Sequence, residues 1–260
     1  MLLLWTMLRM KVLLMIRYRV DFVAQIITMY LFFVVLFFGG RAAVGSIGGG
    51  GTGVIGDTLD AIIVGWFLWT MAVSSYSSLS SEVTQESRWG TLEQLFMSPH
   101  GFGVVLTTKV VVNVLTSLLM GGIMLSLMIV TTGRTLTIDL LSVVPVVILT
   151  LMTTIGLGYV FAGLTLIYKK ISSVRQIAQF GLVGLIAAPA VDVPLLRVLP
   201  LVQGSAMLQE TMRDGVRFWQ FPMPEIGVLV VTALVYWAAG YVLFMFCSRV
   251  ARRRGVMAHY

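Results

Sequence analysis

Three carboxylates gather in one polar segment of this chain, residues 82–99 (EVTQESRWGTLEQLFMSP), which lies between two long apolar stretches. Apolar residues at helical spacing form one stripe, Glu86 and Glu93 lie on a different face, and Pro99 ends the pattern. A helix parallel to the membrane would bury the stripe and present its carboxylates to a soluble partner. The alternative is a solvated helix without a partner. The chemistry that this spacing favours is docking through charge.

Catalytic chemistry is not expected from this sequence. Its two histidines are His100, directly after the polar segment, and His259, so neither forms a helical metal pair or a buried dyad with its neighbours. The run GGGGTG lacks the lysine and the preceding strand of a phosphate-binding loop. The single cysteine, Cys247, is expected to be an apolar filler. We therefore expect no catalytic, metal or cofactor residue, and a nucleotide would have to be bound by another chain.

The composition predicts an integral membrane protein. Of the 260 residues, 58% are hydrophobic and 11% are charged, with a mean hydropathy of +0.96, whereas soluble domains carry about 25% charged residues. Segments of twenty or more nearly uncharged residues suit helices that cross a hydrocarbon core about 30 Å thick. The alternation of a membrane β-barrel is absent. Since most basic residues flank the apolar segments, the net charge of +7 does not predict nucleic-acid binding.

We expect an all-α polytopic membrane protein with six transmembrane helices in a single domain, residues 1–260. Residues 2–19 are expected to form an interfacial helix whose basic side chains snorkel; alternatively, they extend the first span. The glycine-rich residues 39–56 are expected to be a flexible connector. The predicted spans are residues 20–38, 59–79, 102–132, 140–168, 173–188 and 226–246.

The segment between the fifth and sixth spans is expected to hold a short amphipathic helix on the outer surface, as part of a re-entrant element. Its apolar face would consist of Met207, Leu208, Thr211 and Met212. Its polar face would consist of Glu210, Arg213, Asp214 and Arg217.

Basic residues set the predicted orientation. Six spans place both termini on one side of the membrane, and thirteen of the 18 Lys and Arg residues then lie on that side. The positive-inside rule makes this side the cytoplasm. The chain is therefore expected in the cell (plasma or inner) membrane, with residues 82–99 in the cytoplasm. The middles of the spans lack the ionisable residue that an ion-coupled carrier normally needs, so energy for transport is expected to enter from outside the bilayer.

The polar segment resembles a known family, the permease subunits of type-2 ATP-binding cassette (ABC) exporters. The matching residues run from Glu86 to Leu95 (ESRWGTLEQL) and close on Ser98 and Pro99. An acidic residue, then GTLE-Q-L, then SP, is characteristic of the loop between the second and third spans in that family. The preceding GWFLW segment and the six spans agree, so the resemblance covers essentially the whole chain.

The resemblance implies a transport subunit without a nucleotide site of its own. Two permease subunits pair, as a homodimer or a heterodimer, and each docks on a cytoplasmic ABC ATPase subunit that binds ATP and Mg²⁺. By this resemblance residues 82–98 form a coupling helix. The implied ATPase-coupling residues are Glu82, Glu86, Arg88, Trp89, Gly90, Thr91, Leu92, Glu93, Leu95, Ser98 and Pro99.

The resemblance also implies a translocation path at the dimer interface, lined largely by the first and fifth spans. The residues to which it points are Tyr30, Phe33, Phe37, Gln176, Gln179 and Phe180. The other interpretation is that these aromatic side chains face lipid or pack within the bundle. An aromatic, charge-poor path favours amphipathic or hydrophobic cargo, such as a drug, a lipid or a glycolipid-like molecule.

Two other function classes remain open at this point. An ion-coupled secondary carrier or channel predicts transport without an ATPase and an essential carboxylate inside a span. An intramembrane enzyme predicts essential His or Asp residues that face one cavity, which the placement of the two histidines disfavours. Expected partners are thus an ABC ATPase, a second permease and membrane lipids, and no nucleic acid.

Overall fold

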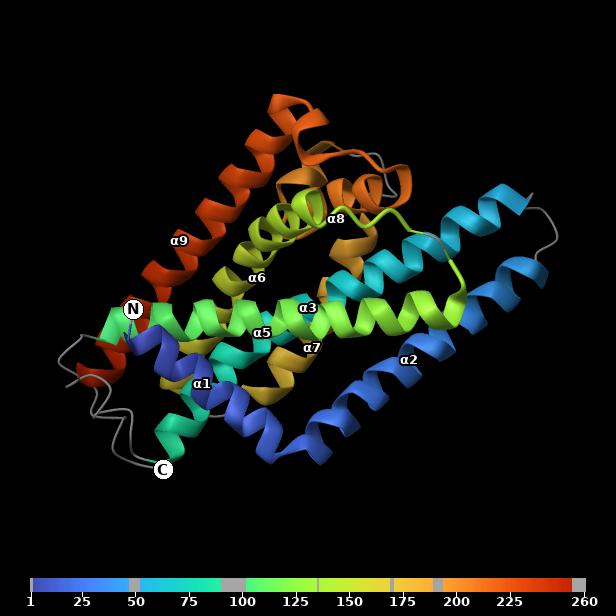
Figure 1. Cartoon of the computed structure of the whole chain (residues 1–260). Helices are drawn as coiled ribbons and strands as arrows, with labels where there is room; N and C mark the ends of the chain where they lie inside the picture. The colour runs from blue at the N-terminus through green and yellow to red at the C-terminus, as the bar shows by residue number, and fades with distance from the viewer. Residues whose placement is uncertain are drawn as a thin grey trace.

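The computed structural model describes residues 2–46, 52–89, 102–134, 136–168, 171–188 and 194–253, and every regular element within these ranges is a helix. Figure 1 shows α1 and α2 meeting at a sharp angle, with α6 and α9 on the other side of the bundle. The α-helices are α1 (Leu2–Arg17), α2 (Arg19–Ser46), α3 (Thr52–Trp89), α5 (Phe102–Thr132), α6 (Leu140–Tyr168), α7 (Ser172–Ala187), α8 (Val202–Gln209) and α9 (Met223–Arg253). Short helical turns follow at η2 (Pro194–Val198), η3 (Glu210–Asp214) and η4 (Phe218–Gln220).

Five of the described helices are long and apolar enough to cross a membrane, and the chain is therefore an all-α, multi-pass membrane protein. The candidate spans are Arg19–Ala42, Thr58–Glu86, Gly103–Thr132, Leu140–Tyr168 and Met223–Ala251. The sixth predicted span corresponds to α7, whose 16 residues are about 24 Å long, less than a hydrocarbon core of about 30 Å. A sixth crossing through α7 stays a prediction.

The glycine-rich connector is shorter than the sequence suggests. Residues 39–46 continue α2, and α3 begins at Thr52, so the prediction of a flexible segment is wrong for these residues. Gly40 lies against Ile62 of α3, where an added Cβ would come within 3.1 Å of the isoleucine Cδ1. In a membrane the backbone must satisfy its own hydrogen bonds, which favours helix even where glycine lowers the intrinsic propensity.

Helices α6 and α9 pack backbone to backbone. A Cβ added at Gly156 would collide with the carbonyl of Tyr236, and one added at Gly240 would collide with the carbonyl of Gly156. About two turns further along, a Cβ at Gly163 would lie 3.1 Å from the Cβ of Cys247. Small residues that allow such close approach are the usual means by which membrane helices associate.

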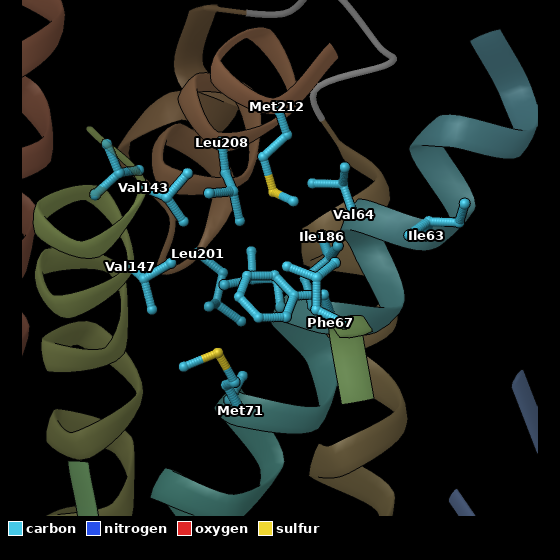
Figure 2. Packing of buried hydrophobic residues seen from close by; sticks show 14 of the residues in the cluster. Ile63, Val64, Phe67, Met71, Val143, Val147, Ile186, Leu201, Leu208 and Met212 are labelled. Carbon is cyan, nitrogen blue, oxygen red and sulfur yellow. The ribbon is translucent and has the colours of Figure 1, made fainter. Parts of the chain in front are cut away.

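The segment between α7 and α9 closes one end of the bundle with an amphipathic helix. The four predicted apolar residues, Met207, Leu208, Thr211 and Met212, are all buried, whereas Glu210, Asp214 and Arg217 are exposed and Arg213 is half-buried. The predicted division of this helix into two faces is confirmed. Figure 2 shows Leu208 and Met212 reaching toward Val64, Phe67 and Ile186. The Ser205 hydroxyl also donates a hydrogen bond of 2.8 Å to the carbonyl of Ile186, which ties α8 to the end of α7.

The carboxyl of Glu210, on the exposed face of this segment, gives a testable pH dependence of stability. Desolvation raises the pKa of its carboxyl, Glu225 and Asp214 raise it further, and Arg197 opposes them. The folded state therefore binds this proton more readily than the unfolded state, and the resulting stability is lost as the pH rises through the raised pKa. We expect wild type to lose thermal stability relative to Glu210→Gln as the pH rises above about 4, the ordinary pKa of a glutamate carboxyl. Thermal unfolding of both proteins from about pH 4 upward measures this loss of stability. Parallel pH profiles of the two proteins would contradict the expectation.

Candidate functional site

The predicted coupling residues begin on the last turns of α3. This helix has 38 residues and is about 57 Å long, so it extends well beyond a hydrocarbon core of about 30 Å. Glu82, Glu86, Arg88 and Trp89 therefore continue the second span as one helix and do not start a separate one. The other predicted coupling residues, Gly90, Thr91, Leu92, Glu93, Leu95, Ser98 and Pro99, lie outside the described residues.

Glu82 and Glu86 meet a lysine of the next helix. Lys109 Nζ of α5 lies 2.9 Å from Glu86 Oε1 and 3.7 Å from Glu82 Oε2. Asn113 Nδ2 donates a hydrogen bond of 3.3 Å to Glu82 Oε1. The three charged side chains are only 20–24% exposed. We call these four residues the α3–α5 polar cluster; its three charged members lie toward the ends of their candidate spans, and Asn113 lies one turn further in than Lys109.

The helical repeat explains why these four residues meet. Glu82 and Glu86 are one turn apart on α3, and Lys109 and Asn113 are one turn apart on α5, so each pair lies on one face of its helix. Because only residues 90–101 separate α3 from α5 in the chain, the end of the first lies near the start of the second. In the sequence, the two matching i, i+4 spacings were the available signal for this pairing.

Hydroxyl groups join α3 to its other neighbours next to this cluster. The Ser75 hydroxyl donates to Ser117 of α5 at 3.2 Å, and Ser80 lies 3.2 Å from the Thr165 hydroxyl of α6. Arg175 of α7 donates to Ser80 at 3.3 Å, while the Tyr76 hydroxyl donates to the Arg175 carbonyl at 2.6 Å. The hydroxyl-rich end of α3 is therefore hydrogen-bonded to three helices.

The three path residues predicted on α2 come together as an aromatic row. Ring centroids of Tyr30 and Phe33 are 6.2 Å apart, and those of Phe33 and Phe37 are 5.4 Å apart. Phe33 and Phe37 are 1% and 3% exposed and belong to the main core. Phe33 also contacts Trp66 of α3, with the centroids 6.4 Å apart. Within the single chain, these side chains support the packing interpretation.

The three path residues predicted on α7 are not brought to that row. Phe180 is 73% exposed, Gln176 is exposed and Gln179 is half-buried. These three side chains form an outward, partly polar face of α7 that lipid or a second chain could contact.

A groove of about 330 Å³ does lie between the first span and α7, but other residues line it. Its walls include Leu36 of α2, Trp66 and Trp69 of α3, and Val183 and Ile186 of α7. The two indole rings are tilted by 34° relative to each other, with their centroids 4.6 Å apart. Sequence reasoning used the GWFLW segment only as part of a resemblance. The i, i+3 spacing of its two tryptophans was the signal that they share a helical face.

Comparison with known proteins adds no relative. No family model, no curated protein and no solved structure matches this chain.

Proposed function

We propose that this chain is the membrane-spanning permease subunit of an ATP-driven exporter of the type-2 ABC class. ATP and Mg²⁺ would bind to a partner ATPase, and residues 82–99 would receive its movement. The observation that carries the proposal is the ESRWGTLEQL…SP motif, whose first four residues are the last four of α3, a helix longer than the hydrocarbon core is thick. A motif at this place is accessible to a soluble partner.

The α3–α5 polar cluster supplies a way to pass movement into the membrane. Residues 90–101 connect Trp89 at the end of α3 to Phe102 at the start of α5. Just inside this connection, Lys109 joins both helices through Glu82 and Glu86. A displacement of the connecting segment would therefore move α3 and α5 together, and the hydroxyl contacts of Ser80 would carry it to α6 and α7.

The groove between α2, α3 and α7 supports an apolar cargo. Its lining is dominated by aliphatic and tryptophan side chains, with Gln209 and Thr58 as polar members. Ligand pockets of this character hold molecules that bury most of their surface against apolar side chains. A hydrophobic or amphipathic substrate fits such a lining better than a hydrated ion.

The main competing function is an ion-coupled carrier. Such a carrier needs ionisable residues deep in the bilayer. In the described spans the ion pairs lie toward the ends: Lys109 with Glu82 and Glu86, and Arg134 with Asp60 at 3.6 Å. This distribution favours an external source of energy.

Affinity purification of the chain from its native membrane in mild detergent is expected to carry an ATPase with it. Glu86→Lys is expected to lower the ATP hydrolysis of the purified complex about tenfold, because a docking carboxylate is replaced by a cation. Gly90→Pro is expected to have a similar effect, since proline interrupts a coupling helix. Both variants should still insert into the membrane.

Glu86 forms an ion pair with Lys109 inside the chain, so Glu86→Lys needs a control that restores this pair. This substitution also places two cations against each other, so the double variant Glu86→Lys with Lys109→Glu is needed to rebuild the internal pair with reversed charges. If Glu86 docks an ATPase, the double variant stays uncoupled. Full recovery of hydrolysis would contradict a docking role for this carboxylate. Labelling of Thr91→Cys by an impermeant thiol reagent in intact cells would contradict the cytoplasmic orientation.

A further inference from the structure

A second cavity, of about 380 Å³, lies between α1, α2, α3 and α5 and is separate from the groove described above. Its polar lining includes Lys11 of α1, Asp21 and Gln25 of α2, Ser77 of α3 and Asn113 of α5. We call it the α1–α2 cavity. It lies where α1, with its basic side chains, meets the start of the first candidate span, an end of the span that would lie at the depth of lipid headgroups in a bilayer.

Opposite charges face this cavity without pairing. Among the described residues, neither Lys11 nor Asp21 has an ion-pair partner, and the two do not pair with each other. The amide of Gln25 and the hydroxyl of Ser77 likewise make no hydrogen bond within the described part of the chain. A cation and an anion are thus held apart across a space large enough for a small ligand.

Apolar side chains form a large part of the remaining lining, which also holds the polar side chains of Tyr18, Ser74, Ser78 and Thr116. Leu14, Met15, Phe22, Met29, Val73 and Met120 border the cavity beside these polar groups. A ligand that fits must therefore combine a charged end with a hydrocarbon part. Free phosphate or a small zwitterion would leave the apolar lining uncovered.

We propose that the α1–α2 cavity binds the headgroup of a phospholipid that carries both a phosphate and a primary ammonium group, as phosphatidylethanolamine does. The phosphate accepts hydrogen bonds from Lys11, and the ammonium donates to Asp21 and Gln25. The glycerol and the first acyl carbons lie against the methionines and Phe22. A choline headgroup cannot donate these hydrogen bonds, and an anionic headgroup without an amine leaves Asp21 unpaired.

This site would connect lipid to the α3–α5 polar cluster. Asn113 lines the cavity and also donates to Glu82, so the bound headgroup and the Lys109 ion pairs share one side chain. The proposal does not depend on a partner ATPase, because it rests on the cavity and on the membrane location of the helices.

Native mass spectrometry of the purified protein with equal amounts of phosphatidylethanolamine, phosphatidylcholine and phosphatidylglycerol tests the assignment. Wild type is expected to retain phosphatidylethanolamine preferentially. Lys11→Gln and Asp21→Asn are each expected to lower its retention about tenfold, since each removes one charge-assisted contact. Arg9→Gln removes the same charge from an exposed position of α1 outside the cavity and should leave retention unchanged.

A filling variant separates lost charge from lost space. Ser77→Phe keeps every charge but occupies the cavity, and is expected to reduce lipid retention while thermal unfolding in detergent confirms that the protein is folded. Equal retention of phosphatidylglycerol by wild type would overturn the assignment of a zwitterionic headgroup. Unchanged retention in both charge variants, or no retained lipid in wild type, would overturn the site itself.

Discussion

Replacing Gly156 with leucine is expected to separate α6 from α9 and to lower the thermal unfolding midpoint by about 5 °C or more. The nearest atoms to an added Cβ are the carbonyl of Tyr236 and the amide nitrogen of Trp237, both backbone atoms that cannot move aside by a rotamer change. Gly240 on the opposite helix meets the carbonyl of Gly156 in the same way. In lipid, close packing and not a hydrophobic force drives helix association. Little therefore offsets the packing that is lost when α6 and α9 separate.

The protein contains its own reporter for this separation. Cys247 of α9 is 5% exposed and faces Gly163 of α6. A thiol-reactive fluorogenic dye should therefore label Cys247 slowly in wild type and rapidly in Gly156→Leu. Gly122→Leu is the matched control, because an added Cβ on α5 at that position meets no atom within 4 Å. If the control and the Gly156 variant unfold at the same temperature, the close approach of α6 and α9 is not what stabilises the pair.

The class of fold could be predicted from composition, because a chain with so few charges cannot fold as a soluble domain. The bounds of α5 and α6 coincide with two predicted spans. For the end of α5 the reason is local: Gly133, with a φ of 63°, directly follows that helix. The amphipathic segment around Met207 was also predictable, since its two faces follow the helical repeat.

The sequence-based prediction and the structure disagree where the conformation of a residue depends on the helix that packs against it. Glycines 39 and 40 are helical although their local propensity favours a loop. The polar Glu82–Trp89 stretch continues α3, where Lys109 of α5 neutralises the carboxylates of Glu82 and Glu86. The groove beside Trp66 and Trp69 depends on where α7 packs, which no spacing within one helix encodes.

The second large expected effect is a loss of stability when the lysine of the α3–α5 polar cluster is replaced. Lys109→Met is expected to destabilise the protein by about 2 kcal/mol, because it leaves two carboxylates one turn apart with no cation between them. Wild type balances them with one lysine at 2.9 and 3.7 Å, in a setting where the side chains are about four-fifths buried. Thermal unfolding in one detergent, with and without the substitution, measures the loss.

Arg134→Met serves as the control at the other end of α3. Its guanidinium lies 3.6 Å from a single carboxylate, Asp60, which at 21% exposed is about as shielded as the two glutamates, so removing the arginine strands one charge in place of two. We expect a smaller loss, of about 1 kcal/mol or less. Equal losses for the two variants would mean that the pair of carboxylates on α3 has no special cost.

Neutralising the carboxylates distinguishes charge from packing. In the Lys109→Met background, Glu82→Gln with Glu86→Gln removes the stranded charges while keeping side-chain volume, and most of the lost stability should return. This follows because the cost of breaking a shielded ion pair lies mainly in the charge left behind. If stability does not return, the lysine acts through the packing of its aliphatic stem against α3, and the end of α3 is held to α5 by shape. In that case a movement of residues 90–101 would reach the bundle without passing through charge, and the coupling proposed for Glu86 would need a different route.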